Sequence, residues 1–266
     1  MKQTEGGFVE FDELADRVGL IRLNDPDRLN AMSEDMAGDF SRLIFKLREK
    51  HPYLRVLVVT GAGRAFSAGG DLKMLQAKTK LGGEENRTKM LGYYNSFLCV
   101  RDLGLPLIAA INGPAIGAGL CLASACDIRI ASDKAKLGMT FAKLGLHPGM
   151  GATYFLPKIM GPALATEFML TARVVDSNEA LKIGLVSKVV PETELLKEAT
   201  NTALEILDCG PQAIKQLLET LRTGTQNLDQ ALKREAIVQG INYAGPEFLE
   251  GLTSVMEKRK ANWEKA

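Results

Sequence analysis

Apolar positions recur with two different periods along the first part of the chain, and these periods predict alternating strands and helices. Residues 8–23 alternate between apolar and polar side chains, which predicts a hairpin of half-buried strands. After Ser33, a residue that can cap a helix, apolar residues at helical spacing predict one buried face as far as Lys50. The continuous apolar run at 55–60 then predicts a fully buried strand. The chain up to this point therefore predicts the order β-β-α-β.

Residues 103–126 carry no charged side chain. Their length would suit a membrane span, but Asn112, Pro114 and several glycines interrupt the apolar run. We therefore predict a short buried strand at 107–111, a turn, and a buried helix that opens near Gly117. Small residues at the start of this helix would let a ligand approach backbone amides that lack a partner inside the helix.

The remaining pattern predicts further strands and helices, and finally helices alone. A loose helical pattern covers 72–101 and is interrupted at Gly82 and Gly83. Farther on, the pattern predicts strands at 128–131, 136–139 and 185–190, a glycine-rich loop at 144–151, a helix that contains Tyr154 and Phe155, a helix at 163–171, and a helix capped by Ser177. Helical periods alone follow, over 193–207, 211–222, 227–242 and 246–261. We therefore predict a strand-bearing core at 1–191 and a helical region at 192–266.

Composition narrows the class of protein without indicating a reaction. The 266 residues carry a formal net charge of +1, which gives no electrostatic case for a nucleic acid or a membrane surface as partner. The four cysteines have neither metal-site spacing nor the density of a disulfide scaffold, so we expect reduced thiols and no metal. The N-terminus lacks the apolar segment of a secretory signal. This predicts a cytoplasmic protein, or an organellar one if a transit peptide has been removed.

The glycine-rich segment at 61–71 follows a predicted buried strand, as a dinucleotide-binding fingerprint would. Phe66 stands where the third glycine of that fingerprint belongs, and no helical pattern begins there. A dinucleotide site is therefore disfavoured.

Taken together, these motifs resemble the crotonase (enoyl-CoA hydratase/isomerase) superfamily over nearly the whole chain. Residues 60–73 are similar to that family's first signature, and 109–119, with Cys126, Asp127 and Ala131 after it, are similar to the second. Shorter matches lie at 28–32, 180–186 and 257–260. The resemblance implies an α/β fold in which a spiral of β-β-α units precedes a helical trimerisation region. It also implies assembly as a homotrimer or a dimer of trimers.

The resemblance further implies an oxyanion hole that binds the thioester carbonyl of an acyl-CoA. Carried over residue by residue, the two donors are the backbone N–H groups of Gly70 and Ala118. An enolate oxygen needs such preorganised donors in a dry site, and losing one typically costs about 3 to 4 kcal/mol of transition-state stabilisation. The small residues in both segments would allow the carbonyl to reach the two amides.

For the coenzyme A portion, the resemblance places cations near the phosphates at Arg28, Arg64 and Lys73, with Lys258 contributed by another subunit. The other positions at which it implies substrate contacts are Leu29, Ala31, Ala68, Gly69, Asp71, Leu72, Ile116, Gly117 and Thr140. Asp71 also precedes a predicted helix, where a carboxylate is a favourable cap, and Asp127 is expected to be a structural anchor. No cofactor is expected to stay bound, because coenzyme A arrives as part of the acyl-CoA substrate.

Two positions depart from the typical hydratases of this family, which use two glutamates to hold water and move a proton. Alignment through the second signature places Cys121 at the first glutamate position, and alignment through 137–141 places Phe141 at the second. A phenylalanine has no proton to give, and a thiol in an apolar wall stays protonated because burial raises its pKa. Hydration by two glutamates is therefore disfavoured by the residues themselves.

Several functions remain open at this point. The protein is expected to be an acyl-CoA enzyme of the enoyl-CoA hydratase/isomerase type that stabilises a thioester enolate, with any base supplied from elsewhere. The candidates for that base are Glu84, Glu85, Tyr93 and Tyr94. The alternatives are an acyl-CoA decarboxylase or other lyase, and an acyl-CoA-binding scaffold without catalysis. His147 can titrate near neutrality and is a candidate auxiliary group, with a hydrogen bond to the backbone as the alternative.

Overall fold

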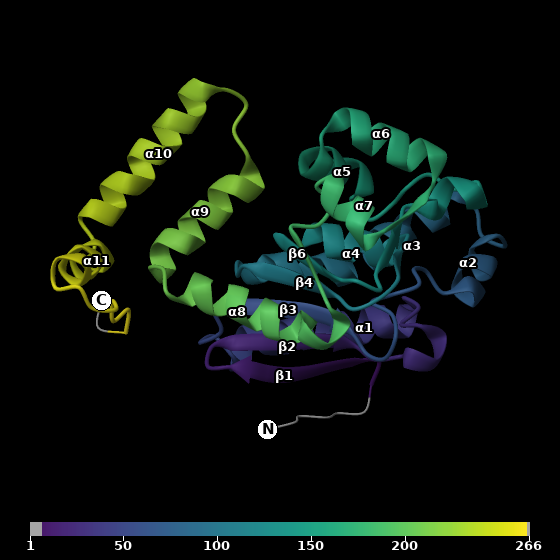
Figure 1. The fold of residues 1–266 in the computed structure, drawn as a ribbon. Coiled ribbons are helices and arrows are strands. Elements are labelled where there is room, and N and C mark those ends of the chain that lie inside the picture. Colours follow the sequence, from purple (N-terminus) through teal and green to yellow (C-terminus); the bar gives the residue numbers. More distant parts are fainter. Residues whose placement is uncertain (1–6, 265–266) are drawn as a thin grey trace.

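The computed structural model describes residues 7–264, and at its centre is a sheet with helices on both faces (Figure 1). Within these residues six strands pair in the order β1 (Val9–Ala15), β2 (Val18–Leu23), β3 (Val56–Gly61), β4 (Leu107–Ile111), β6 (Ile128–Ser132) and β9 (Lys188–Val190). The predicted hairpin is confirmed as β1 and β2, and every further pair in this sheet is parallel. The loops that follow the neighbouring strands β3 and β4 therefore leave the same edge of the sheet.

Alternate residues of the buried strands face two different hydrophobic clusters. Leu57 of β3 belongs to the larger cluster, together with Phe40 of α1 (Glu34–Lys50). Val58, on the opposite face, belongs to the second cluster, which includes apolar residues of α8 (Leu195–Leu207). All residues of β3 are buried, as its continuous apolar run predicts.

The helix α8 packs on the sheet although it follows the predicted boundary at residue 191. Its Leu195, Ala199 and Ala203 are buried in the second hydrophobic cluster. The division into 1–191 and 192–266 stays a prediction, but the first long helix beyond the boundary contributes to the packing of the sheet.

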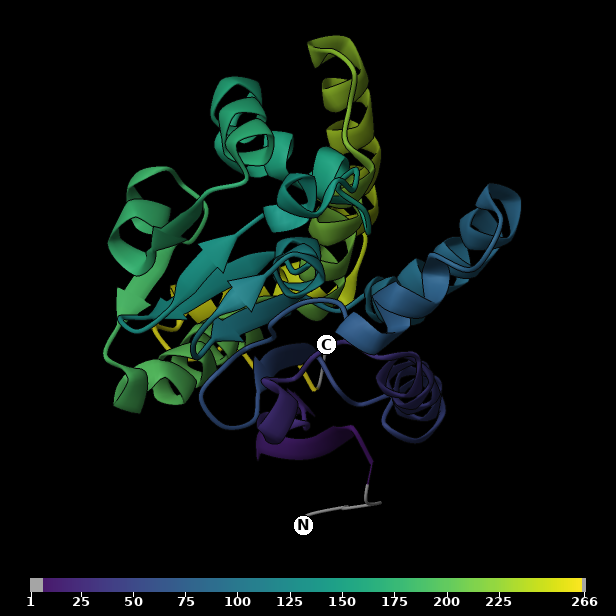
Figure 2. The ribbon, with the colours of Figure 1, turned by 90° about the vertical axis from the view of Figure 1, so that its right-hand side faces the viewer.

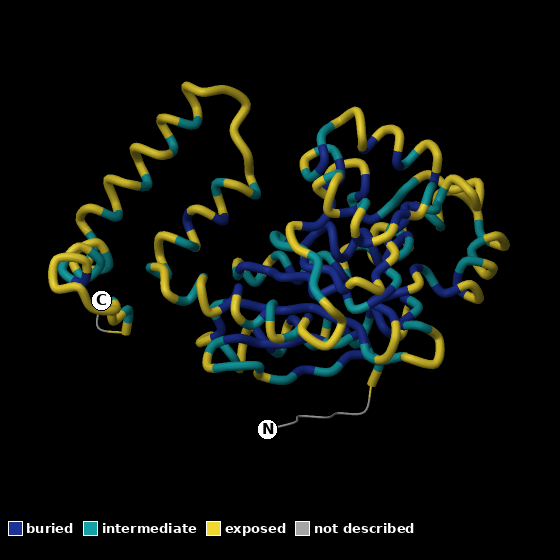
Figure 3. Tube along the Cα trace, in the orientation of Figure 1, coloured by how far each residue is buried: buried dark blue, intermediate teal, exposed yellow. Residues whose placement is uncertain are grey.

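After α8 the chain leaves the sheet, and its last helices stand apart from it (Figures 1 and 3). They are α9 (Pro211–Thr223), α10 (Leu228–Tyr243) and α11 (Pro246–Met256). Large exposed apolar side chains on them are Leu217, Leu221, Leu228, Leu232, Ile237, Ile241, Phe248, Leu249, Leu252, Val255 and Met256. Exposed apolar side chains gathered in this way are typical of a surface that binds another protein.

Asp127 ties the first of these helices to the sheet. Both of its carboxylate oxygens accept hydrogen bonds from Arg222 of α9, at 3.0 and 2.6 Å. The backbone N–H of Leu107, at the start of β4, also donates to Asp127, at 2.8 Å. The predicted role of Asp127 as a structural anchor is therefore confirmed.

A smaller sheet and shorter helices surround the edge at which β3 and β4 end. Within the described residues this second sheet contains β5 (Ala115–Ile116), β7 (Lys136–Gly138) and β8 (Val174–Asp176). The α-helices of this part are α2 (Leu72–Lys78), α3 (Gly83–Leu98), α4 (Ala118–Ala125), α5 (Ala152–Met160), α6 (Pro162–Thr171) and α7 (Ser177–Lys182). Short 3-10 helices cover Pro26–Arg28, Cys99–Leu103, Thr140–Leu144 and Glu192–Glu194. In Figure 2 the blue segment that contains α2 and α3 stands out at one side of the molecule.

Several element boundaries differ from the sequence predictions, each for a local reason. The predicted cap of α1 is confirmed, since the Ser33 hydroxyl accepts from the Met36 N–H at 3.1 Å. The predicted cap of α7 is wrong: the Asp176 carboxylate accepts from the Glu179 N–H, and Ser177 is already helical. The strand predicted at 185–190 pairs only over Lys188–Val190, and the helix predicted at 246–261 ends at Met256. In the described part of the chain, no helix is long and apolar enough to cross a membrane.

Candidate active site

Two loops run side by side at the edge of the sheet, where β3 and β4 end. The first loop (residues 62–71) follows β3, and the second loop (residues 112–117) follows β4. Ser67 joins them in a parallel bridge: its N–H donates to the Pro114 carbonyl, and its carbonyl accepts from the Ile116 N–H, both at 3.0 Å. The sheet thus brings together two segments that are about fifty residues apart in the sequence.

Two asparagine side chains fix the path of the first loop. The Asn30 amide nitrogen donates to the carbonyls of Ala62 and Ala65, at 2.9 and 2.8 Å. The Asn112 side chain accepts from the Gly61 N–H at 3.1 Å and donates to the Gly63 carbonyl at 2.9 Å. Because Asn30 is fully buried, these bonds satisfy polar groups that would otherwise be costly to bury. No pattern in the sequence predicts this role of the two asparagines, because their partners are distant in the chain.

Glycines permit the close approach of the two loops. A Cβ atom on Gly119 would lie 2.6 Å from the Ser67 carbonyl oxygen, and one on Gly69 would lie 2.7 Å from the Ile116 carbonyl oxygen. Gly69 also has φ +98°, a conformation that residues with a side chain rarely adopt. A side chain at either position would therefore push the loops apart.

The backbone N–H groups of Gly70 and Ala118 have no acceptor among the described residues. Met32 bonds to the Gly69 carbonyl and to the Asp71 N–H, so the intervening Gly70 N–H points to the other side of the segment. The Ala118 N–H is the first of α4, and the first N–H groups of a helix lack an acceptor within it. Both residues line one cavity, and a Cβ atom on Gly69 would lie 3.6 Å from the Ala118 nitrogen. The two residues with unpaired amides therefore line the same cavity.

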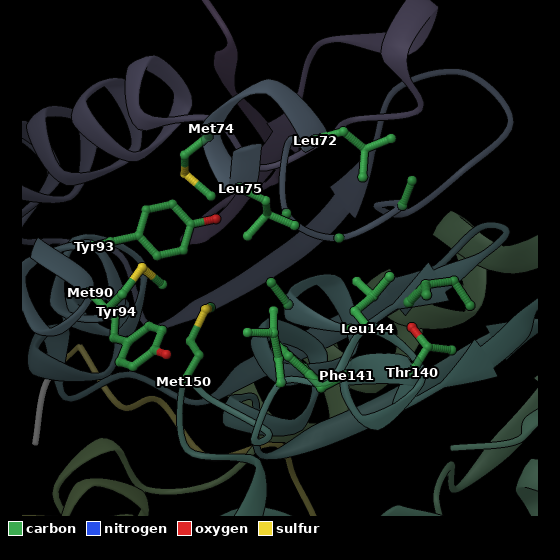
Figure 4. Close-up of a pocket in the computed structure, with 17 residues that line it drawn as sticks. Leu72, Met74, Leu75, Met90, Tyr93, Tyr94, Thr140, Phe141, Leu144 and Met150 are labelled. Carbon is green, nitrogen blue, oxygen red and sulfur yellow. The ribbon is translucent and has the colours of Figure 1, made fainter. Parts of the chain in front are cut away.

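This cavity lies between the two loops, α2, α3 and the segment at 140–150, and encloses about 620 Å³ including its open mouth (Figure 4). Its lining residues are Ala68, Gly69, Gly70, Leu72, Met74, Leu75, Met90, Tyr93, Tyr94, Ile116, Gly117, Ala118, Thr140, Phe141, Leu144, Leu146 and Met150. These include no aspartate, glutamate, histidine, lysine or arginine. The side-chain polar groups of the lining are the hydroxyls of Thr140, Tyr93 and Tyr94, in an otherwise apolar wall.

The comparisons with known proteins agree with this arrangement. A model of the enoyl-CoA hydratase/isomerase family matches residues 13–266. The chain belongs to this family. It is 35% identical over 253 residues to a crotonyl-CoA hydratase of Syntrophomonas wolfei, covering 94% of this chain and 96% of that protein. It is 34% identical over 246 residues to a short-chain-enoyl-CoA hydratase of Clostridium acetobutylicum, covering 92% and 93%.

Solved structures of the enoyl-CoA hydratase/isomerase family share the fold. The crystal structure of an enoyl-CoA hydratase from Bacillus anthracis superposes with a TM-score of 0.89 at 33% identity, over 96% of this chain and 98% of that one. The predicted α/β crotonase-like fold with C-terminal helices is therefore confirmed. How the chain assembles stays a prediction.

The position predicted to match the first family glutamate is Cys121, a buried thiol that is not among the residues lining the cavity. The Cys121 Sγ donates to the Gly149 carbonyl at 3.3 Å and lies 3.9 Å from the Met139 sulfur. Its burial removes the thiolate from water and raises its pKa far above the ordinary value. Phe141, predicted to match the second family glutamate, does line the cavity and adds an apolar ring to it. The structure thus places no carboxylate at either position.

The buried thiol makes a prediction about chemical labelling. Iodoacetamide reacts with thiolates, so it should alkylate the exposed Cys209 in the native protein and leave the buried Cys121 and Cys126 unmodified until unfolding. Peptide mass spectrometry before and after denaturation measures the difference. Alkylation of Cys121 at the rate of Cys209 in the native state would show that its thiol is accessible.

The two tyrosines of the lining differ in the state of their hydroxyl groups. Tyr93 is buried, and its hydroxyl donates to the Met32 carbonyl at 2.8 Å. Tyr94 is half-buried, and its hydroxyl has no hydrogen-bond partner among the described residues. Burial is the largest cause that raises the pKa of both hydroxyls, so both keep their protons at neutral pH.

The two glutamates proposed as bases lie outside the cavity lining. Glu84 forms an ion pair with Arg87, and Glu85 forms one with Lys89.

Other residues predicted at the site fall into two groups. The first group lines the cavity and consists of Ala68, Gly69, Leu72, Ile116, Gly117 and Thr140. The second group, Leu29 and Ala31, is not part of the lining. The Leu29 carbonyl accepts a hydrogen bond from the Ala68 N–H of the first loop. Asp71 caps α2 by accepting from the Met74 N–H at 2.8 Å, as expected of a carboxylate at a helix start. His147 is exposed, and its Nδ1 lies 2.7 Å from the Pro148 carbonyl oxygen, which agrees with the alternative of a hydrogen bond to the backbone.

The four predicted phosphate-binding cations lie outside the cavity lining. Arg28 is paired with Asp25 at 2.7 Å and with Asp71 at 3.2 Å. Arg64 and Lys73 are exposed near the two ends of the first loop. Lys258 follows α11, at the end of the molecule opposite to α2 (Figure 1). Within one chain Lys258 is therefore far from the cavity.

Proposed function

We propose that the protein binds an acyl-CoA thioester in this cavity and stabilises the thioester enolate with the Gly70 and Ala118 N–H groups. The observation that supports the proposal is a pair of unpaired amides on two residues that line one apolar cavity. Membership of the enoyl-CoA hydratase/isomerase family supports an acyl-CoA as substrate. No cofactor has to stay bound, because coenzyme A comes and goes with the acyl group.

The physical basis of the proposal is the charge that an enolate places on its oxygen. Two fixed N–H donors compensate that charge without reorganising during the reaction, and the apolar lining keeps the local dielectric low, which strengthens both hydrogen bonds. Bonds of this kind tighten as negative charge develops, so they stabilise the transition state more than the bound substrate. The cavity therefore favours reactions that proceed through an enolate.

The absence of a carboxylate from the cavity lining favours decarboxylation as a second candidate. In a β-carboxyl acyl-CoA, the bond between the α-carbon and the carboxylate breaks, carbon dioxide leaves, and the electron pair enters the enolate. This step needs no side-chain base, and an apolar surrounding disfavours the charged carboxylate. A third candidate, acyl-CoA binding without catalysis, would need the cavity but not the two donors.

The exposed apolar side chains of α9, α10 and α11 support assembly as a homotrimer or a dimer of trimers. In such an assembly Lys258 of one subunit would approach the coenzyme A bound to another. Arg64 and Lys73 are exposed near the two ends of the first loop, so both charges are free to attract phosphates. Arg28 contributes less, because two carboxylates already compensate its charge.

A turnover screen tests the proposal. Crotonyl-CoA, a 3-enoyl-CoA and methylmalonyl-CoA are incubated with the protein, and the products are identified by mass spectrometry. The enolate proposal expects turnover of at least one of them, and the decarboxylase candidate expects propionyl-CoA from methylmalonyl-CoA. Robust hydration of crotonyl-CoA that survives Cys121→Ala and Phe141→Leu would point to a base elsewhere and remove the decarboxylase candidate. Binding of the thioesters without any turnover would support the non-catalytic alternative.

A further inference from the structure

Among the three hydroxyl-bearing residues of the lining, Tyr93 donates a hydrogen bond to the Met32 carbonyl, whereas the hydroxyls of Tyr94 and Thr140 have no hydrogen-bond partner among the described residues. The Tyr94 side chain packs against the larger hydrophobic cluster, and its ring lies edge-on to Tyr93 at 6.2 Å between ring centres. Tyr94 belongs to α3, and in Figure 4 its hydroxyl is directed toward Met150, another residue of the cavity lining. No described residue accepts the proton of this hydroxyl. An unpaired hydroxyl at an apolar cavity wall is a group that a ligand can use.

Gly149 connects Tyr94 to the position where the first family glutamate is missing. The Tyr94 hydroxyl occupies the space that a side chain on Gly149 would take. The carbonyl of the same Gly149 accepts the hydrogen bond from the Cys121 thiol. The hydroxyl therefore lies close to the wall that Cys121 supports, although it comes from a different helix and a different part of the sequence.

We propose that the Tyr94 hydroxyl is the proton donor to the α-carbon of the enolate that the Gly70 and Ala118 amides hold. The inference rests on the proposed function and names the group that completes it. The enolate α-carbon uses its electron pair to form a C–H bond, the O–H bond of Tyr94 breaks, and the tyrosinate then takes a proton from water. The same step completes decarboxylation and any addition to an enoyl thioester.

The chemistry of the cavity suits a donor better than a base. Burial raises the pKa of Tyr94 and keeps the hydroxyl protonated before the reaction. The α-hydrogen of a thioester is a much weaker acid than a phenol. Proton transfer from the hydroxyl to the enolate carbon therefore lowers the free energy. Tyr93 is a poorer proton donor to the enolate, because its hydroxyl already donates a hydrogen bond to the Met32 carbonyl.

The test is the stereochemistry of the new C–H bond in heavy water. The wild type, Tyr94→Phe and the control Tyr154→Phe are incubated with crotonyl-CoA and with methylmalonyl-CoA, and the deuterium at the α-carbon of each product is assigned by NMR. Tyr154 is a half-exposed tyrosine of α5 outside the cavity lining, and its hydroxyl donates to the Arg222 carbonyl at 3.4 Å, so the control removes a tyrosine hydroxyl elsewhere in the molecule. Thermal melting checks that Tyr94→Phe folds, which we expect because it removes a hydroxyl without a protein partner.

We expect one stereoisomer from the wild type and from Tyr154→Phe. Tyr94→Phe should turn over about 10²-fold more slowly, the usual effect of losing a general acid, and should give both stereoisomers because water protonates either face. A single stereoisomer at the wild-type rate from Tyr94→Phe would overturn the role of Tyr94 and leave the enolate function standing. Failure of the wild type to turn over either of these two thioesters would overturn the role of Tyr94, and failure with the 3-enoyl-CoA as well would overturn the enolate function.

Discussion

Gly70→Pro should lose about 10²- to 10³-fold of its thioester turnover while keeping its fold, because proline lacks the N–H that binds the carbonyl. The bridge between the first loop and Met32 uses the Gly69 carbonyl and the Asp71 N–H, so no internal hydrogen bond is lost. Steady-state kinetics with the best thioester of the turnover screen measures the effect, and circular dichroism confirms folding.

Gly70→Ala is the matched variant because alanine keeps the amide. The atoms nearest to a Cβ atom on Gly70 would belong to the Leu75 side chain, at an ordinary contact distance of 3.6 Å. Its turnover should therefore fall much less than that of Gly70→Pro. Equal losses in the two variants would show that the side chain at this position matters and the N–H does not.

Gly119→Ala should impair both stability and turnover. The added Cβ would lie 2.6 Å from the Ser67 carbonyl oxygen and 2.7 Å from the Ser67 Cβ, so the two loops must move apart. Overpacking of this kind costs about 1 to 3 kcal/mol of unfolding free energy. The movement also displaces the neighbouring Ala118 N–H, and a misplacement of about 1 Å can cost on the order of 10² in rate. Urea unfolding and steady-state kinetics measure the two effects.

Gly92→Ala is the control for Gly119→Ala. Gly92 is exposed within α3, outside the cavity lining, and a Cβ atom there meets nothing within 4 Å. Alanine should raise the unfolding free energy by about 0.5 to 1 kcal/mol, since glycine is unfavourable inside a helix. If Gly119→Ala unfolded at the same urea concentration as the wild type, the close packing of the two loops would be refuted.

Long periodic patterns predicted the elements that support the site. The alternation at 8–23, the helix after Ser33 and the buried runs of β3 and β4 each reflect a local preference that the tertiary structure keeps. The turn between β4 and α4 was also predictable, because Asn112, Pro114 and the glycines interrupt an apolar run. These elements suffice to place the two loops at one edge of a parallel sheet.

The parts that pattern alone could not predict depend on long-range contacts. The 3-10 helix at Thr140–Leu144 and the strand β5 are too short to show a period. Tyr93 and Tyr94 are adjacent in the sequence, but only the Tyr93 hydroxyl makes a hydrogen bond. Its acceptor is the carbonyl of Met32, which is distant in the sequence. The burial of Asn30 likewise depends on carbonyl groups more than thirty residues away.

The central claim is that the amides of Gly70 and Ala118 bind the thioester carbonyl. Isotope-edited infrared difference spectroscopy of butyryl-CoA, labelled with carbon-13 at its carbonyl, measures this directly in the bound state. We expect the carbonyl stretch to move to lower frequency on binding to the wild type, because two hydrogen bonds polarise the bond, and to move less in Gly70→Pro. A bound carbonyl that absorbs at the frequency of free butyryl-CoA, with the same spectrum in Gly70→Pro, would contradict the claim.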